Sequence, residues 1–100
     1  MTRYEFVQVL GHGGHAEKAF VLYNPGPTAV TVTGVTTSCE CLRVELADYV
    51  IGPGESVSGM LVVDFRNEPQ FAGDLLLRAE GSTDGVPGPA FVIEAGVSVR

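Results

Sequence analysis

The sequence predicts a single all-β domain in which two sheets pack face to face as a sandwich. Its 100 residues, 45% of them hydrophobic, are enough to bury one core. Valine, threonine and glycine are frequent whereas lysine occurs once, at Lys18, and this usage is typical of strands and turns. Apolar side chains recur at every second position in short segments that turn residues separate, and no helical period is present. We therefore expect residues 1–100 to form one β domain.

The turn residues divide the chain into seven expected strands: residues 4–10, 18–23, 30–35, 42–46, 57–65, 72–79 and 90–99. The first alternates apolar and polar side chains as an edge strand does. The second carries Phe20 and Leu22 on one face. Between the second and the third, Pro25 presets φ and Gly26 accepts the positive φ of a type II turn. The third alternates valines with threonines, which predicts a half-buried strand.

The later strands follow the same pattern. The fourth is short, with Leu42, Val44 and Leu46 on one face. The turn at residues 52–55 leads into the fifth, the most apolar strand, which we expect at the centre of its sheet. The sixth places leucines on both faces, and the loop at 81–89 holds too much glycine and proline for regular structure. With the seventh strand, short antiparallel strands and turns about every ten residues describe an immunoglobulin-like β-sandwich.

The charge balance bears on the classes of partner. The formal net charge is -6, from six basic and twelve acidic side chains. Nucleic acids and anionic lipid surfaces need clustered basic residues. Here the basic residues are scattered along the chain: Arg3, Lys18, Arg43, Arg66, Arg78 and Arg100. No apolar run approaches the roughly 18–20 residues that span a bilayer. We expect a soluble acidic protein that binds no nucleic acid and does not insert into a membrane.

The first residues, Met1 to Tyr4, lead directly into a strand pattern, without the long apolar segment of a secretory signal peptide. Either the protein is cytosolic, or the chain is cut from a longer one. The two cysteines leave the redox compartment open.

Five short motifs follow one another in a set order. Asn24-x-Gly26 ends one strand, Thr37-Ser38-Cys39-x-Cys41 ends the next, Pro53-Gly54-Glu55 comes before an apolar strand that closes in Val62-Val63-Asp64-Phe65, and Gly73 opens the strand after it. By this order and spacing, the chain resembles the bacterial domain of unknown function fifteen seventy-three over residues 20–99. That family is similar in turn to the immunoglobulin-like group of major sperm protein and the abnormal-spindle/Hydin modules. The resemblance implies the sandwich fold and an extracytoplasmic location, periplasmic or secreted. It implies no established activity.

One residue departs from the family pattern. The family usually has glycine between the two cysteines, whereas this chain has Glu40. A residue with a side chain favours extended backbone at this position over a tight turn that depends on glycine.

Cys39 and Cys41 are the only cysteines, and they stand one residue apart at the end of an expected strand. In a regular strand such residues share a face with Cα atoms about 6.5–7 Å apart, near the limit for a disulfide. A disulfide therefore requires a bend in the chain. As free thiolates the pair could instead bind a soft metal, Cu(I) or Zn(II), or carry out thiol redox chemistry. Both could also be small buried hydrophobic residues. The sequence leaves these alternatives open.

If successive strands alternate in direction, the connections gather at two ends of the domain. The segments expected at one end are 11–15, 38–41 and 67–71, and those expected at the other are 24–27, 52–55 and 81–89. The first group brings together a mixed nitrogen and sulfur set that could hold copper or zinc: His12, His15, Cys39, Cys41 and Glu68. A glycine-rich loop is costly to order, so the two histidines could equally be solvated.

Little else in the sequence predicts catalysis. Ser38 beside Cys39 has no evident His–Asp relay, and Asp64, Asp74 and Asp84 fall at a strand end or in turns, where solvated or capping roles are usual. We expect no enzymatic activity and no cofactor other than the candidate copper or zinc ion.

Two surfaces could recruit a protein partner. The first and last strands are expected at sheet edges, where another chain can add a strand, so we expect a monomer or an edge-strand dimer. Ser82, Thr83 and Asp84 form the candidate binding loop. The sequence thus predicts a non-enzymatic immunoglobulin-like module for protein interaction or structural spacing. The alternative is a small soft-metal-binding or thiol-redox protein that uses the Cys-x-Cys pair.

Overall fold

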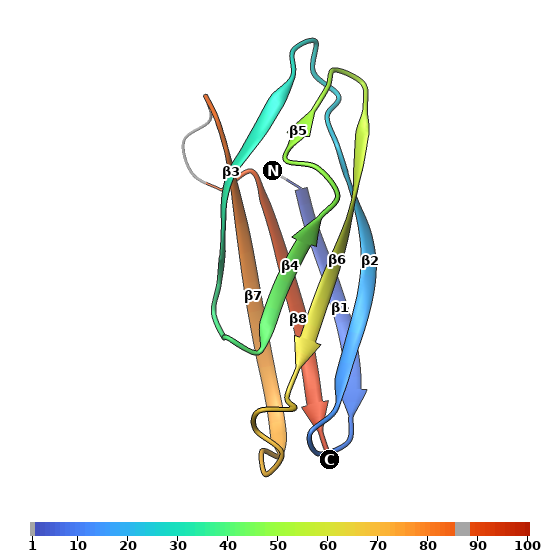
Figure 1. The fold of residues 1–100 in the computed structure, drawn as a ribbon, viewed down its shortest axis with the longest axis vertical. Helices are drawn as coiled ribbons and strands as arrows, with labels where there is room; N and C mark the ends of the chain where they lie inside the picture. Colours follow the sequence, from blue (N-terminus) through green and yellow to red (C-terminus); the bar gives the residue numbers. More distant parts are fainter. Residues whose placement is uncertain (1, 86–88) are drawn as a thin grey trace.

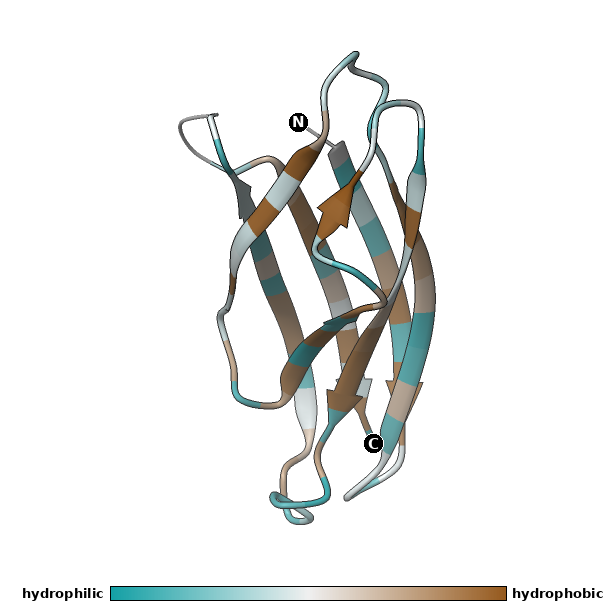
Figure 2. Cartoon of the chain, turned by 45° about the horizontal axis from the view of Figure 1, so that its top comes forward, coloured by the Kyte–Doolittle hydropathy of each residue, from teal (hydrophilic) through white to brown (hydrophobic). Residues whose placement is uncertain are grey.

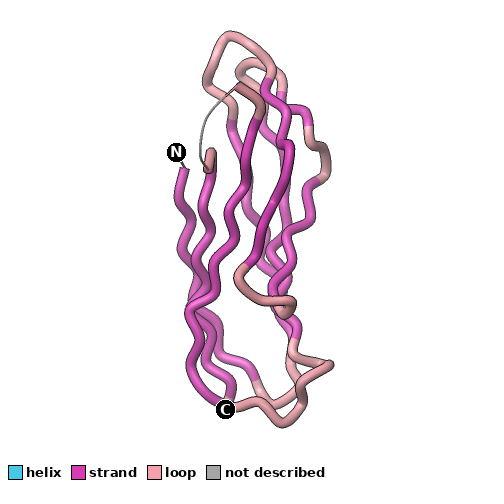
Figure 3. Tube along the Cα trace, turned by 90° about the vertical axis from the view of Figure 1, so that its left-hand side faces the viewer, coloured by secondary structure: helices cyan, strands magenta, loops and turns pink. Residues whose placement is uncertain are grey.

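The computed structural model describes residues 2–85 and 89–100, and in these residues eight β-strands form two sheets (Figure 1). The strands are β1 (Thr2–Leu10), β2 (His15–Tyr23), β3 (Val30–Thr37), β4 (Leu42–Leu46), β5 (Val50–Ile51), β6 (Ser56–Asp64), β7 (Gly73–Thr83) and β8 (Phe91–Val99). The larger sheet has the order β1-β8-β7-β3-β5 and the smaller one β2-β6-β4. The two sheets face each other as the predicted immunoglobulin-like sandwich (Figure 3). Within the described ranges, no helix is long and apolar enough to cross a membrane.

The sheet topology differs from the prediction in one pairing. β1 pairs with β8 in parallel, from Thr2↔Phe91 to Leu10↔Val99, so the strands are not all antiparallel. β8 consequently lies between β1 and β7, and of the two strands expected at sheet edges only β1 is an edge. The prediction for the most apolar strand is confirmed, because β6 lies between β2 and β4.

Two strand limits and one additional strand also differ. β2 begins at His15, which the sequence places in a loop. β7 continues to Thr83, where the sequence predicts a loop from residue 81 onward. Gly81 fits in this strand because the ring of Phe91, directly opposite in β8, fills the space of the absent side chain. The two-residue strand β5 has no counterpart in the prediction, since so short a strand shows no period.

The alternation of valine and threonine in β3 is interrupted by a bulge. The register against β7 shifts between Val32 and Gly34. Val32 is buried before the shift, and Val35 is the half-buried residue after it. The extra residue reverses the phase of the strand, as expected for a bulge, so Val35 packs against the same core as Val30 and Val32. The valines thus share one face as predicted, although strict alternation ends at Val32.

The core lies between the sheets and is formed by side chains that alternate along the strands (Figure 2). Ile93, Ala95 and Val97 of β8 are almost fully buried, and Leu61 and Phe65 face them from β6 and the residue after it. Burying a valine, leucine, isoleucine or phenylalanine side chain contributes about 1.5–3 kcal/mol. The core thus fixes the strands whose ends carry the candidate site.

The domain is elongated, with extents of 47 × 22 × 19 Å. Because β1 and β8 are parallel, the start of β1 and the end of β8 are separated along the long axis by the length of a strand (Figure 1). Eight steps of about 3.3 Å give a separation of roughly 26 Å between these two points.

Candidate functional site

The two cysteines form a disulfide at the corner where the chain leaves the larger sheet after β3 and enters the smaller one at β4. Their Cα atoms are 5.1 Å apart, closer than in a regular strand, because the chain turns at Glu40 and Cys41. The Leu42 N–H closes this turn on the Cys39 carbonyl at 3.1 Å. The expectation of extended backbone at Glu40 is therefore wrong. A turn of this kind needs no glycine, since Glu40 keeps a negative φ.

The disulfide lies beside an acidic depression. A pocket of about 60 Å³ is lined by Glu40, Cys41, Asp64, Asn67 and Glu68. The Asp64 N–H donates to the Cys41 carbonyl at 2.8 Å and ties the corner to the end of β6. Negative charge beside a thiol disfavours the thiolate, so these surroundings oppose nucleophilic sulfur chemistry.

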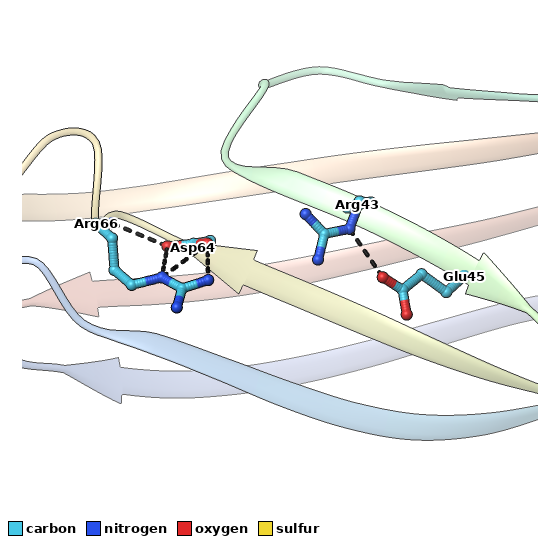
Figure 4. Close-up of polar contacts among 4 residues, drawn as sticks. All are labelled: Arg43, Glu45, Asp64 and Arg66. Carbon is cyan, nitrogen blue, oxygen red and sulfur yellow. Dashed lines mark hydrogen bonds and ion pairs between the residues drawn. The ribbon is translucent and has the colours of Figure 1, made fainter.

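Asp64 is held by Arg66, as Figure 4 shows. The Arg66 side chain donates to both carboxylate oxygens, with Nη2 2.6 Å from Oδ2, and its backbone N–H lies 2.9 Å from Oδ1. These hydrogen bonds, the side-chain ones first, lower the pKa of Asp64 well below its usual range. Asp64 is thus a fixed anion, which is unsuited to proton transfer near neutral pH.

The two histidines occupy different surroundings. His12 lies in a turn that the Gly14 N–H closes on the Gly11 carbonyl at 3.1 Å, with Gly13 at φ 67. His15 is exposed in β2 and is opposite Asp64 in the ladder with β6. The loop after β1 packs against the chain after β6, because the Phe65 N–H donates to the Gly14 carbonyl at 2.9 Å.

The structure therefore brings the loop after β1, the corner at Cys41 and the chain after β6 together, as expected from the alternation of strands. Over the part of the chain that is described, no three His, Cys, Asp or Glu side chains are grouped so as to hold a metal ion. The disulfide also leaves no thiolate in this form of the protein. The set Cys39, Cys41, His12 and His15 is not assembled as a metal centre here, and a copper or zinc site in the reduced protein stays a prediction.

The candidate binding loop is partly strand. Ser82 and Thr83 belong to β7, where Ser82 pairs with Gly34 of β3. Asp84 accepts a hydrogen bond from the Thr31 N–H at 2.8 Å, and its own N–H donates to the Thr31 carbonyl. Asp84 thus closes the end of the β3–β7 ladder. Residues 86–88 of the expected loop lie outside the described residues.

Sequence reasoning missed the role of Asn24, which is the buried polar residue of the described core. Its side-chain amide donates to the carbonyls of Thr28, Ile51 and Gly52 at 2.8–3.2 Å, and its Oδ1 accepts from Gly26. The Asn-x-Gly and Pro-Gly-Glu motifs are therefore two turns that one side chain joins. The sequence signal for this role was an asparagine placed before two turn motifs, and it indicates a structural role.

Exposed apolar side chains lie on the outer face of the larger sheet. Val7 of β1 and Leu76 of β7 flank Gly96 of β8 in one row, and they are 82% and 70% exposed. Two such residues do not form an extended apolar patch, and single exposed apolar side chains are normal on a protein surface.

The comparisons with known proteins agree with this fold. A family model described as "Protein of unknown function (DUF1573)" matches residues 1–83. Among curated proteins, none matches the sequence.

Several solved structures are similar in fold. A protein of unknown function from Porphyromonas gingivalis W83 has a TM-score of 0.76 at 19% identity, over 97% of this chain and 44% of that chain. A family 123 glycoside hydrolase from Clostridium perfringens has a TM-score of 0.76 at 10% identity, over 97% of this chain and 23% of that chain. SSP-19, an MSP-domain protein like family member from Caenorhabditis elegans, has a TM-score of 0.54 at 13% identity, over 95% and 94% of the two chains. This chain spans less than half the length of the first two. At these identities the likeness shows the fold alone, which SSP-19 shares over nearly the whole length of both chains.

Proposed function

The chain belongs to the DUF1573 family of proteins of unknown function, and on that premise we propose that it is a non-enzymatic immunoglobulin-like module that spaces the segments attached to its two ends and resists tension between them. The observation that carries this proposal is the parallel pairing of β1 with β8. In that arrangement the two ends of the domain are held apart by a strand length.

The parallel pair also determines how the domain responds to force. Pulling on both ends drives β1 and β8 in opposite directions along their own axes. The nine paired residues of β1 then carry the force together, because every rung of the ladder is sheared at once. If both strands were pulled from one end, the rungs would open one after another at lower force.

The non-enzymatic part of the proposal is supported by the state of the reactive side chains. Cys39 and Cys41 are bonded to each other, and Asp64 is held as an anion by Arg66. A catalytic nucleophile or general base needs a thiolate or a group with a pKa near the working pH. These residues instead have structural roles at the end of β6.

An extracytoplasmic location, periplasmic or secreted, is part of the same proposal. The disulfide supports it, because disulfides persist in oxidising compartments and are rare in the cytosol. Protein segments attached to either end are then the partners that the module separates.

Single-molecule force spectroscopy tests this function. We expect a higher unfolding force with handles at Thr2 and Arg100, which shear the β1–β8 ladder, than with handles at Gly11 and Arg100, which peel it open. Equal forces in the two geometries would contradict the proposal.

A matched pair of proline variants isolates the ladder. The Arg100 N–H donates to the Leu10 carbonyl at 2.9 Å, so the backbone groups of Leu10, and of Gln8 two residues earlier, point toward β8. Gln8→Pro removes a rung, whereas Val9→Pro changes an N–H on the free side of β1. The shear force should fall in Gln8→Pro and stay near the wild-type value in Val9→Pro.

A further inference from the structure

Half of β7 is an unpaired sheet edge. The β3–β7 ladder ends at Thr37↔Ala79, and one further contact follows, between Ser38 and Arg78. From residue 73 to residue 77, β7 pairs with β8 on one side and with none of the described strands on the other (Figure 1). We call residues 73–77 the open edge.

The direction of the free backbone groups follows from Arg78. Its N–H donates to the Ser38 Oγ at 2.9 Å and its carbonyl accepts from the Ser38 N–H at 2.8 Å. Backbone groups alternate sides along a strand with a period of two, so those of Leu76 and Asp74 point to the same side as those of Arg78. Two N–H and two carbonyl groups therefore face solvent on the open edge.

The open edge lacks several of the features that protect edge strands, although Asp74 places one charge on it. It contains no proline or lysine, and its ladder with β8 has no register shift. Leu76 is exposed, and Leu75 is half-buried. β1, at the other side of the same sheet, differs, because the Tyr4 hydroxyl donates to the Val21 carbonyl and ties that edge to β2.

We propose that a second copy of this chain adds its own open edge here, antiparallel and two-fold symmetric about Leu75. In this register Asp74 of each copy is opposite Leu76 of the other. The free groups of both copies then satisfy one another in four hydrogen bonds. The two Leu75 residues form the central pair, with Cα atoms about 4.5 Å apart.

The neighbouring registers are disfavoured for specific reasons. A shift by two residues in one direction puts Asp74 of the second copy opposite Arg78, a position that Ser38 already occupies. A shift by two in the other direction puts Asp74 opposite Asp74, and like charges directly opposite are destabilising. In the proposed register β7 of the second copy begins at Gly73, where φ is 139 and the chain turns, so it stops before Ser38. This match of length favours a second copy over an arbitrary extended segment.

The proposed dimer does not depend on the proposed spacing function, so either proposal can fail while the other holds. Its interface is small, and each copy carries a charge of -6, so association is tested at high salt, where repulsion is screened. Sedimentation equilibrium at millimolar concentration compares the wild type with Leu76→Pro, Leu76→Lys and the control Val7→Lys. Val7 is as exposed as Leu76 and lies in the same row, but it is on β1.

We expect a wild-type dimer whose dissociation constant rises roughly ten- to hundredfold in Leu76→Pro, because two of the four hydrogen bonds are lost. Leu76→Lys should leave the dimer at least as tight, because the new lysine is directly opposite Asp74 of the other copy and opposite charges there attract, and Val7→Lys should leave it unchanged. The Leu76 N–H takes no part in the ladder with β8, so Leu76→Pro removes no internal bond, and circular dichroism checks its fold. A monomeric wild type overturns the proposal, as does a dimer that Val7→Lys disrupts and Leu76→Pro does not.

Amide hydrogen exchange supplies a second readout at the same site. The amides of Asp74 and Leu76 should exchange more slowly as protein concentration rises, whereas those of Leu75 and Leu77, which face β8, should be protected at every concentration. Concentration-independent exchange at Asp74 and Leu76 in a dimeric sample would place the contact elsewhere and overturn the proposed register.

Discussion

Asn24 shows how one side chain organises a whole end of the domain. Its amide group contacts the turn after β2 and the strand and turn around β5. Its backbone N–H and carbonyl bond Glu55 and Gly54. Two loops that are about 28 residues apart in sequence thus share a single buried polar residue, which leaves few alternatives for their relative position.

Asn24→Ala should lower the free energy of unfolding by about 2–4 kcal/mol, because one buried carbonyl and two partly buried ones lose their donor at once. Urea denaturation measures the change. The control is Asn67→Ala, at an exposed loop position, which should change stability by less than about 0.5 kcal/mol. Similar losses of stability in the two variants would mean that the Asn24 hydrogen bonds make no specific contribution to the free energy of unfolding.

The disulfide closes a loop of only three residues, so its effect on stability should be small. The chain-entropy relation gives about 1.5 kcal/mol for such a loop. A thiol assay should find no free thiol in the oxidised protein, even in denaturant, and reduction should lower stability by about that amount without loss of the fold. The Cys39→Ser/Cys41→Ser double variant should match the reduced protein in urea denaturation. Two thiols titrating in the untreated protein would contradict the disulfide.

The same samples test the soft-metal alternative. A disulfide sulfur is not a thiolate, so the oxidised protein should bind neither Zn(II) nor Cu(I) through Cys39 and Cys41. Titration of the reduced protein with Zn(II) and Cu(I) then tests whether the two free thiols bind a metal. Tight stoichiometric binding that Cys39→Ser, Cys41→Ser and His15→Ala each abolish would favour the metal-binding function over the proposed one.

At the scale of strands, two glycine–phenylalanine pairs hold the sheets in register. Phe20 is directly opposite Gly59 in the smaller sheet, and Phe91 is directly opposite Gly81 in the larger one. In each pair the ring lies over the glycine, where a Cβ would be 2.4 Å or 1.9 Å from it. The ring shields the backbone from solvent and compensates for the absent side chain.

Gly59→Ala should destabilise the domain by about 1–3 kcal/mol through overpacking, because the new methyl group meets the buried Phe20 ring. In a Phe20→Leu background the added cost of Gly59→Ala should shrink, since the two residues share one space. Gly34→Ala is the control, because a Cβ there meets nothing within 4 Å. Thermal or urea denaturation of the four variants gives the coupling free energy between residues 20 and 59. Strictly additive losses of stability would exclude the contact between them.

The limits of the strands show what the sequence could and could not predict. Six of the seven expected strands lie within three residues of an observed strand at both ends, because their alternation and turn residues are local signals. β7 is the exception, since Gly81 and Ser82 favour turns locally but are held in the strand by pairing with β3 and β8. Such pairing overrides propensity and is not visible in a single segment. β5 is held by two residue pairs with β3, which no periodic pattern reveals.

For the whole molecule, the sequence predicted the sandwich but not the direction of its outer pair. Alternation defines which face of a strand is buried, and it carries no information on whether a neighbour is parallel or antiparallel. The parallel β1–β8 pair, on which the proposed function rests, therefore had to come from the structure. The same is true of the open edge, since it depends on where β3 turns away at Ser38.

The separation of the two ends by the β1–β8 pair can be tested by circular permutation. The start of β1 and the end of β8 are roughly 26 Å apart, whereas the ends of most domains are close together. Arg100, a linker of three residues and Met1 together span at most about 20 Å between these two points. A permutant that joins Arg100 to Met1 by three residues, with new ends in the exposed loop at residues 67–70, should therefore lose most of its stability, because it must break the β1–β8 ladder. A permutant with the same new ends and a linker of about 14 glycine and serine residues should span the distance and fold.

Urea denaturation compares the stabilities of the two permutants. Because they share their new ends, any difference in stability is due to the linker alone. If the short-linked permutant is as stable as the long-linked one, the ends are close together and β1 cannot run parallel to β8.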